Sequence, residues 1–218
     1  FYLVGDIKDG KFVPTQESRP YHYGHRNSYA AQTFSDVPDR RIKIAWDVLH
    51  APESVFENQM VIPVEVSLRK VGEDYRLRTL PVKEFGSLRE RTETFRIKDV
   101  ENFRYALDRK GYDIELTAPK ASPDFAIRFF GYELRVKPSE NTLSYHNVTM
   151  PLSYTDGEIK LRLISDVLGL EIFADDGLIY SVVGSLADYG IRYLKVESLV
   201  GEQIPDVALT VHTLNGIW

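Results

Sequence analysis

The acidic residues are the leading candidates for catalytic groups in this sequence. Two carboxyl groups held roughly 5 to 9.5 Å apart can cleave a glycosidic bond, one as the acid and the other as nucleophile or base. The chain contains 32 acidic residues, so a pair by itself indicates little. Asp175 and Asp176 are adjacent, but residues 174–177 form a sequence that is typical of a hairpin turn. We therefore predict that both shape a turn, and we interpret Asp6, beside another predicted hairpin, in the same way.

The sequence does not indicate a metal or cofactor site. The chain has no cysteine and five histidines. His22 and His25 are three residues apart, but no third ligand follows at a suitable spacing, and zinc in proteins is usually held by at least three side chains. No nucleophile-elbow motif marks a catalytic serine, and the glycines are single turn residues rather than a phosphate-binding loop. We expect no metal ion and no cofactor.

Aromatic residues near the N-terminus are mixed with amide and basic side chains, a combination that suits a sugar. Sugars offer apolar C–H faces and many hydroxyl groups, which aromatic rings and polar side chains can bind. The group consists of Tyr21, Tyr23, Tyr29, Phe34 and Trp46 with Arg26, Asn27, Gln32 and His50. From it we predict Asn27, Tyr29 and Trp46 as substrate-binding residues. The alternative is that these aromatic residues form the core of a β domain.

Composition and charge narrow the range of partners. The 218 residues are 43% hydrophobic and 27% charged, with a formal net charge of -5. Basic and acidic residues are interspersed, whereas nucleic-acid binding normally needs a basic stripe, so we expect no nucleic acid partner. No apolar run approaches the length of a membrane span, so we expect no membrane partner. No targeting segment is visible, which leaves an extracellular or a cytoplasmic location open.

Short β-rich segments dominate the chain and would have to position any such site. They recur roughly every 8 to 15 residues between Gly, Pro, Asn and Asp, a spacing typical of sandwiches, barrels and propellers. Hairpin turns are predicted at residues 8–10, 37–40 and 174–177. In residues 158–164 apolar and charged side chains alternate, which predicts a half-buried strand. Residues 99–107 are the one predicted helix, with Asp99 as its N-cap, and a domain junction is predicted in residues 81–91.

Five segments carry a more specific pattern: residues 2–6 with Phe12, then 29–35, 41–46, 59–69 and 170–177. Residues 2–6 are similar to a Tyr-x-x-Gly-Asp strand with a following Phe, and residues 170–177 to a Val-Glu-x-Phe-x-Asn-Asp-Gly signature. In kind and in order, these segments resemble glycoside hydrolase family 32, which comprises invertases, inulinases and levanases. The resemblance covers nearly the whole chain, and a series of motifs in the correct order is more specific than any one of them.

The resemblance implies an all-β fold, the last part of a five-bladed β-propeller followed by a C-terminal two-sheet β-sandwich. It places the end of the propeller in residues 1–80 and the sandwich in residues 81–218. It also implies retaining hydrolysis of β-fructosyl bonds by an Asp in Asn-Asp-Pro and a Glu in Glu-Cys, with a further Asp in Arg-Asp-Pro. None of these motifs occurs in the chain. We therefore expect the chain to begin downstream of them and to contain no catalytic residue.

Two functions follow from these expectations. The favoured one is that the chain is the C-terminal part of a levanase-like fructan or sucrose hydrolase, with the sandwich as a structural support, and is inactive alone. The alternative is a non-catalytic carbohydrate-binding or interaction module. In the first case the partner is fructan or sucrose bound by the full-length protein, and exposed propeller edges would allow self-association.

Overall fold

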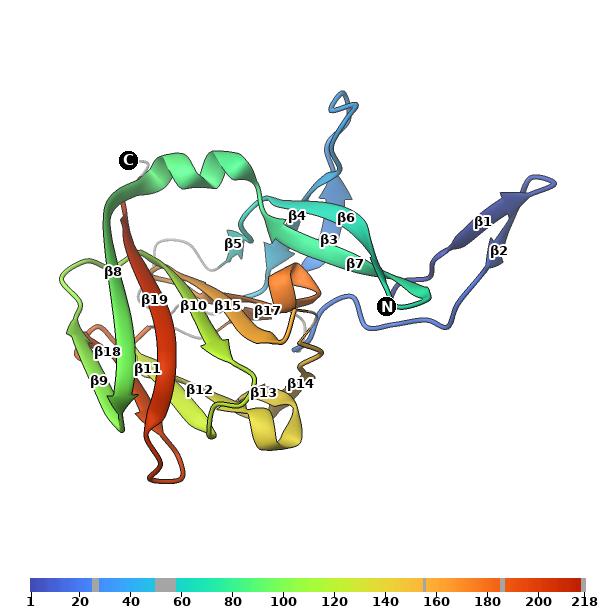
Figure 1. The fold of residues 1–218 in the computed structure, drawn as a ribbon. Helices are drawn as coiled ribbons and strands as arrows, with labels where there is room; N and C mark the ends of the chain where they lie inside the picture. Colours follow the sequence, from blue (N-terminus) through green and yellow to red (C-terminus); the bar gives the residue numbers. More distant parts are fainter. Residues whose placement is uncertain (25–27, 50–57, 155, 185–186, 217–218) are drawn as a thin grey trace.

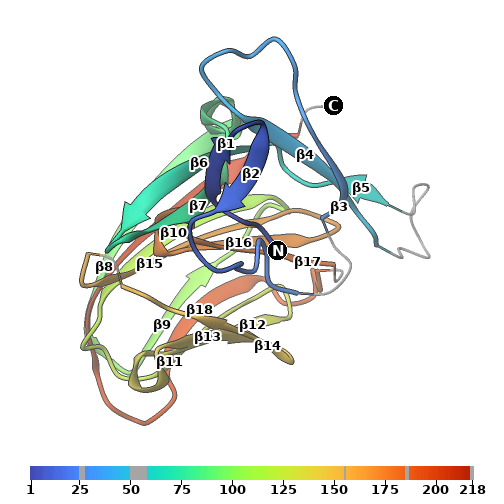
Figure 2. The ribbon, with the colours of Figure 1, turned by 90° about the vertical axis from the view of Figure 1, so that its right-hand side faces the viewer.

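The computed structural model describes residues 1–24, 28–49, 58–154, 156–184 and 187–216. In these parts the chain consists of β-strands joined by turns and by short 3-10 segments. Figure 2 shows three layers: a small N-terminal sheet lies over one sheet of a sandwich, and the second sandwich sheet lies below. No helix in the described ranges is long and apolar enough to cross a membrane.

The N-terminal part forms a hairpin and a five-stranded sheet. The hairpin of β1 (Gly5–Lys8) and β2 (Lys11–Pro14) projects away from the rest of the molecule (Figure 1). Asp9 and Gly10 have φ angles of 51° and 73°, as the predicted tight turn requires. The sheet, called the N-terminal sheet below, has the order β3-β4-β6-β7, with β5 paired to β4. Its strands are β3 (Tyr29–Thr33), β4 (Ile42–Asp47), β5 (Gln59–Met60), β6 (Val64–Val71) and β7 (Asp74–Pro81).

The remaining strands form a sandwich of two six-stranded antiparallel sheets. The sheet next to the N-terminal sheet has the order β17-β16-β15-β10-β19-β8, and the outer sheet has the order β14-β13-β12-β11-β18-β9. The first contains β8 (Arg89–Val100), β10 (Tyr112–Pro119), β15 (Glu158–Ser165), β16 (Leu170–Ala174), β17 (Ile179–Val183) and β19 (Ile204–Leu214). The second contains β9 (Asn102–Ala106), β11 (Phe125–Phe129), β12 (Tyr132–Lys137), β13 (Thr142–Tyr145), β14 (Val148–Pro151) and β18 (Tyr193–Ser198). The 3-10 segments are η1 (Lys83–Leu88), η2 (Pro138–Glu140) and η3 (Asp175–Gly177).

The main hydrophobic core lies between the two sandwich sheets. In β15, Ile159, Leu161 and Leu163 are buried in this core, whereas Lys160 and Arg162 between them point to the other face. This is the alternation predicted from the sequence, and it arises because successive side chains of a strand point to opposite faces. Burial of the apolar face stabilises the sandwich through the hydrophobic effect.

The predicted helix in residues 99–107 is wrong. Residues up to Val100 belong to β8, and residues 102–106 form β9. Asp99 has a φ of 50° and lies near the end of β8, between two residues that pair with β19, and not at a helix N-terminus. Phe103 and Tyr105 both pack on Phe95, with ring centroids 5.3 and 5.2 Å apart. Phe103 and Tyr105 lie on the same face of β9, two residues apart, so the segment forms a strand although its apolar residues also fit the spacing of a helix.

A second hydrophobic cluster joins the N-terminal sheet to the sandwich. Ala45, Val61 and Val64 from the N-terminal sheet pack on a set of side chains from β15, β16 and β17: Ile164, Phe173, Tyr180 and Val182. The N-terminal sheet ends at Pro81, and the first sandwich strand begins at Arg89, with η1 between them. The assignment of residues 1–80 and 81–218 to separate domains stays a prediction.

Candidate functional site

Three exposed side chains form a row across neighbouring strands of the N-terminal sheet. Tyr29 in β3 is the register partner of Trp46 in β4, and Trp46 is the partner of Met60 in β5. Paired residues of antiparallel strands project from the same face of a sheet. The rings of Tyr29 and Trp46 are 6.3 Å apart at an angle of 58°, and the three side chains are 64%, 38% and 53% exposed. This apolar row is the candidate sugar-binding site.

A β-bulge in β3 sets the position of Tyr29. Tyr29 lies opposite Trp46 and Gln32 lies opposite Ile44, so two residues of β3 face a single residue of β4. The first of these two, Ala30, has a φ of 47°. Bulges bend a strand and re-aim its side chains, and they are frequent next to functional sites. The bulge therefore allows Tyr29 to face the Trp46 ring.

Strand β4 has one face toward the sandwich and one toward the apolar row. Lys43, Ala45 and Asp47 are buried, whereas Ile44 and Trp46 between them are partly or largely exposed. The buried face packs on the sandwich through the second hydrophobic cluster. Because strand side chains alternate, burial of one face leaves Trp46 on the other.

The structure brings together only part of the predicted aromatic group. Tyr29 and Trp46 are neighbours, as above. Asn27, the third predicted substrate-binding residue, lies outside the described residues, as do Arg26 and His50. Tyr21 packs against Tyr180 in the second hydrophobic cluster, and Tyr23 packs against the main core. The core interpretation therefore applies to Tyr21 and Tyr23, and the surface interpretation to Tyr29 and Trp46.

Met60 was missed by the sequence analysis. It belongs to a two-residue strand, and its side chain joins the apolar row only because β5 pairs with β4. The available signal was the alternation of Met60 with the buried Val61, but Met60 pairs with Trp46, a residue 14 positions earlier in the sequence. Phe34 is also exposed, but it lies beyond the end of β3.

A buried polar group lies on the sandwich-facing side of the N-terminal sheet. The Glu171 carboxylate accepts hydrogen bonds from the Ile62 N–H at 2.6 Å and from the Tyr180 hydroxyl at 2.8 Å. Burial raises the pKa of Glu171 to about 7. Lys43 Nζ donates to Ser28 Oγ at 3.0 Å and lies 4.4 Å from the centre of the Tyr21 ring. Burial lowers the pKa of Lys43 to about 8, although the nearby Glu171 carboxylate acts in the opposite direction.

A cavity of about 590 Å³ lies beside this group and contains three acidic residues, Asp47, Asp166 and Glu171. The Asp47 carboxylate accepts a hydrogen bond from Gln59 Nε2 at 3.0 Å. The Asp166 carboxylate accepts bonds from the N–H groups of Leu168 and Gly169, at 2.9 and 3.2 Å, and its pKa is raised by burial. Both oxygens of Glu171 are also engaged. Each carboxylate therefore holds a strand or a turn in place, and we assign all three a structural role.

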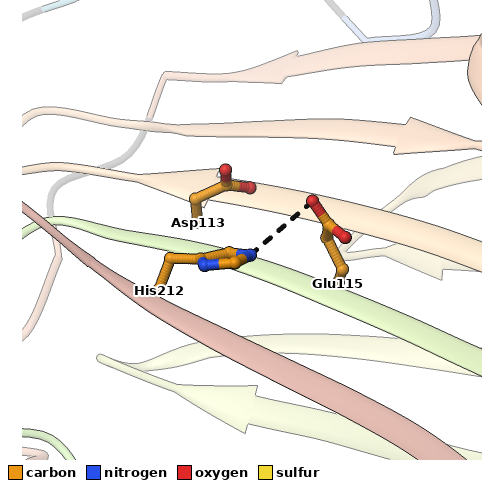
Figure 3. A group of neighbouring side chains, drawn as sticks. All are labelled: Asp113, Glu115 and His212. Atoms are coloured by element: carbon orange, nitrogen blue, oxygen red, sulfur yellow. Dashed lines mark ion pairs between the residues drawn. The ribbon is translucent and has the colours of Figure 1, made fainter. Parts of the chain in front are cut away.

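A second charged group lies on the sandwich sheet, where Figure 3 shows Asp113, Glu115 and His212 pointing toward one another. Their potential ligand atoms lie within 4.8 Å of one another, close enough to hold a metal ion. However, Asp113 is paired with Arg89 at 2.6 Å and with Arg162 at 2.8 Å. Two guanidinium groups beside two carboxylates balance the charge and would repel a cation, so we interpret the group as an ion-pair network.

His212 completes this network as a neutral side chain. Its Nδ1 is 2.7 Å from Thr92 Oγ1, and burial lowers the pKa of the imidazole, with the Arg89 charge as the next cause. The network joins β8, β10, β15 and β19, which lie far apart in the sequence, so no local spacing could have indicated it. Of the predicted histidine pair, His22 stacks on Tyr21, and His25 lies outside the described residues.

Comparison with known proteins shows that the whole chain is similar to part of two levanases. No family model matches the chain. The chain is 27% identical to a levanase of a Bacillus species over 256 residues and 27% identical to a levanase of Bacillus subtilis over 261 residues. Both matches cover 100% of this chain, but it spans only 28% and 38% of the two levanases.

Solved structures share the fold. An exo-inulinase from Aspergillus awamori superimposes with a TM-score of 0.81 at 16% identity, covering 99% of this chain and 50% of the inulinase. A GH32 β-fructofuranosidase from Bombyx mori gives a TM-score of 0.74 at 16% identity, covering 98% of this chain and 46% of that enzyme. The expected fold class is thereby confirmed. The chain is a relative of the levanases and has the fold of the C-terminal part of glycoside hydrolase family 32, the end of a β-propeller followed by a two-sheet β-sandwich.

Proposed function

We propose that the chain is the part of a fructan-cleaving glycoside hydrolase that completes its propeller and supports it with the sandwich. The observation that carries the proposal is the relationship to two levanases along the entire chain. In this proposal residues 1–80 are the end of the catalytic domain and residues 81–218 are the supporting sandwich. The substrate is a fructan or sucrose bound by the full-length protein.

The apolar row supplies a binding surface of the kind that a fructosyl unit needs. The ring of Trp46 and the ring of Tyr29 offer flat apolar faces to the C–H groups of a sugar, and Met60 extends this surface. Aromatic residues contribute much contact area with few rotatable bonds, so little conformational entropy is lost on binding. We therefore assign the row to substrate binding and not to bond cleavage.

The acids that cleave the bond belong, in this proposal, to a part of the protein outside these 218 residues. Retaining glycosidases need a nucleophile and an acid/base about 5 to 5.5 Å apart across the glycosidic bond. The Asn-Asp-Pro, Arg-Asp-Pro and Glu-Cys motifs are missing from the sequence. The carboxylates of the cavity, Asp47, Asp166 and Glu171, are engaged in holding backbone and side chains.

The proposal predicts that the 218-residue chain binds fructo-oligosaccharides without cleaving them. Calorimetric titration should show saturable binding that Trp46→Ala weakens by about 3- to 10-fold, the loss of one aromatic contact worth about 0.5–1.5 kcal/mol. Leu68→Ala, at another exposed apolar position of the N-terminal sheet, is the matched control and should leave binding unchanged. Release of fructose from levan, inulin or sucrose by the chain would contradict the assignment of the acids.

The alternative function, a non-catalytic carbohydrate-binding or interaction module, is supported by the same exposed row. The two functions differ in what they require of the full-length protein. A fructan hydrolase should lose substrate affinity and retain its bond-cleaving step when Trp46 is replaced. A pure binding module should show binding by the full-length protein with no fructose release at any enzyme concentration.

A further inference from the structure

We propose that Glu171 is a positioning residue for the apolar row, because it holds the backbone next to β5 from the sandwich side. The inference rests on the proposed function, since it names a residue that controls the substrate-binding surface. Glu171 lies in β16, and the row projects from the face of β4 that points away from the sandwich. Glu171 therefore acts on the row through the N-terminal sheet and does not touch a bound sugar.

Glu171 contacts the backbone beside β5 through one short hydrogen bond, in addition to the second hydrophobic cluster and the Asp176 ion pairs that also join the two parts. Glu171 Oε1 accepts the Ile62 N–H at 2.6 Å across 109 residues of sequence. The other carboxylate oxygen accepts the Tyr180 hydroxyl at 2.8 Å, which fixes the carboxylate plane. Glu171 is 7% exposed. A hydrogen bond to an ionised acceptor in such a site is stronger than one between neutral groups.

Ile62 is directly connected to the apolar row along the backbone. The N–H of the preceding residue, Val61, donates to the Ala45 oxygen at 2.9 Å, and Met60 pairs with Trp46. Strand β5 has two residues and pairs with β4 alone among the described strands. Such a short strand has few ladder hydrogen bonds, so its position depends on what holds its ends. Glu171 holds the end that leads to Ile62.

The cavity beside Glu171 leaves one side of this end unfilled, although Val61 is buried in the second hydrophobic cluster and Ile62 packs partly against it. Met60, Ile62 and Glu171 all line the space of about 590 Å³. In a filled core, neighbouring side chains would block a shift of the backbone, because interiors are close-packed. Here the cavity leaves space on one side of Ile62, so the hydrogen bond to Glu171 restrains the backbone on the side that packing does not fill. When this hydrogen bond weakens, the Met60 and Trp46 side chains would lose their common plane with Tyr29.

The proposed contact depends on pH. Burial raises the pKa of Glu171 to about 7, so the carboxylate gains a proton as the pH falls below neutrality. A protonated carboxyl group is a weaker acceptor for the Ile62 N–H. The titratable and charged groups that face Glu171 are Tyr21 before β3, Lys43 and Asp47 of β4, Asp166 before β16, and Tyr180 of β17. The row should therefore be better ordered above pH 7 than below it.

A direct test follows the Trp46 ring without any sugar. The chain has two tryptophans, Trp46 and Trp218, so Trp218→Phe leaves Trp46 as the sole indole reporter. Its quenching by acrylamide is measured between about pH 5.5 and about pH 8.5, the range in which Glu171 titrates. We expect a sigmoidal change with a midpoint near pH 7 and easier quenching on the acidic side. A curve without this midpoint would overturn the proposal.

Two substitutions separate positioning from general folding. Glu171→Gln keeps an oxygen that can accept the Ile62 N–H but cannot ionise, so the pH dependence should disappear while the row stays ordered. Glu171→Leu removes the acceptor, and Trp46 should be easily quenched at every pH. Glu140→Gln, in the exposed η2 segment, is the matched control and should keep the midpoint. A midpoint unchanged in Glu171→Gln would contradict the role of Glu171, even if Glu171→Leu fails to fold.

Sugar binding then tests the consequence for function. The dissociation constant for fructo-oligosaccharides should be about tenfold higher at pH 5.5 than at pH 8.5 in the Trp218→Phe chain, and should change less than about twofold in Glu171→Gln. In the full-length protein the effect should appear in KM and not in kcat. If the chain binds no fructan, the proposed function fails, whereas the Trp46 quenching curve still decides the role of Glu171.

Discussion

At the residue scale, Glu171 and Lys43 are two ionisable groups placed between the N-terminal sheet and the sandwich. Both are buried, with exposed fractions of 7% and 6%. Burial disfavours the charged form of each group, so it raises the pKa of Glu171 to about 7 and lowers the pKa of Lys43 to about 8. Neither residue could be identified as buried from the sequence, because a Lys or Glu in a strand is most often on the solvent side.

These shifts predict a minimum of stability near pH 7 to 8. Between its ordinary value of 4.5 and about 7, Glu171 keeps a proton in the folded state that the unfolded state has lost, so stability falls as the pH rises. Between about 8 and its ordinary value of 10.5, Lys43 has lost a proton that the unfolded state keeps, so stability rises with pH. Each contribution amounts to at most about 3 kcal/mol.

Urea denaturation at several pH values measures this directly. In Glu171→Gln the fall between pH 5 and pH 7 should disappear, and Glu140→Gln should retain it, since that control residue lies in an exposed segment. A free energy of unfolding that rises through this interval in the unmodified chain would show that Glu171 is ionised at lower pH than its burial implies.

At the element scale, the hairpin β16–η3–β17 joins the two parts of the molecule. Asp176 pairs with Arg69 at 2.9 Å and with Arg78 at 2.8 Å, and both arginines belong to the N-terminal sheet. Asp175 accepts bonds from the N–H and hydroxyl of Ser153 within the sandwich. The predicted turn is confirmed. The structure adds that its two aspartates hold different parts of the chain.

Gly177 in this turn should be replaceable only at a high cost in stability. It has a φ of +85°, and a Cβ atom there would lie 2.5 Å from the Thr79 backbone oxygen. Gly157 also has a positive φ, +73°, but open space around it. Gly157→Ala therefore reports the backbone strain alone, about 1–2 kcal/mol. Gly177→Ala should add about 1–3 kcal/mol for the displaced strand. If both substitutions lower the free energy of unfolding by the same amount, the contact between position 177 and Thr79 of β7 contributes nothing to the cost.

At the scale of the whole molecule, the β1–β2 hairpin carries exposed apolar side chains and extends away from the sandwich. The β1–β2 hairpin projects into solvent (Figure 1), and the register pair Ile7 and Phe12 is 71% and 48% exposed. Phe1 and Leu3 are exposed as well. Exposed apolar side chains such as the Ile7–Phe12 pair are frequent at protein interfaces.

We expect the 218-residue chain to self-associate through this hairpin. Sedimentation velocity should show a weight-average mass that rises with concentration, and Ile7→Lys with Phe12→Lys should reduce it, because charges in an apolar contact lose hydration. Val200→Lys, at an exposed apolar position remote in sequence from the hairpin, is the control. A monomer at every concentration would argue against association through the propeller edge.

The sequence by itself determined the all-β fold, the hairpin turns at residues 8–10 and 174–177, and the alternation of residues 158–164, because these depend on local backbone preference and on a period of two. It also predicted the similarity to levanases, which the comparison along the whole chain shows at 27% identity. Only the tertiary structure decided that Tyr29, Trp46 and Met60 share an exposed row while Tyr21 and Tyr23 are partly buried against the two hydrophobic clusters. An alternation of apolar and polar residues shows that a strand has one apolar and one polar face. Which face is covered depends on contacts such as Glu171 to Ile62, which are distant in sequence.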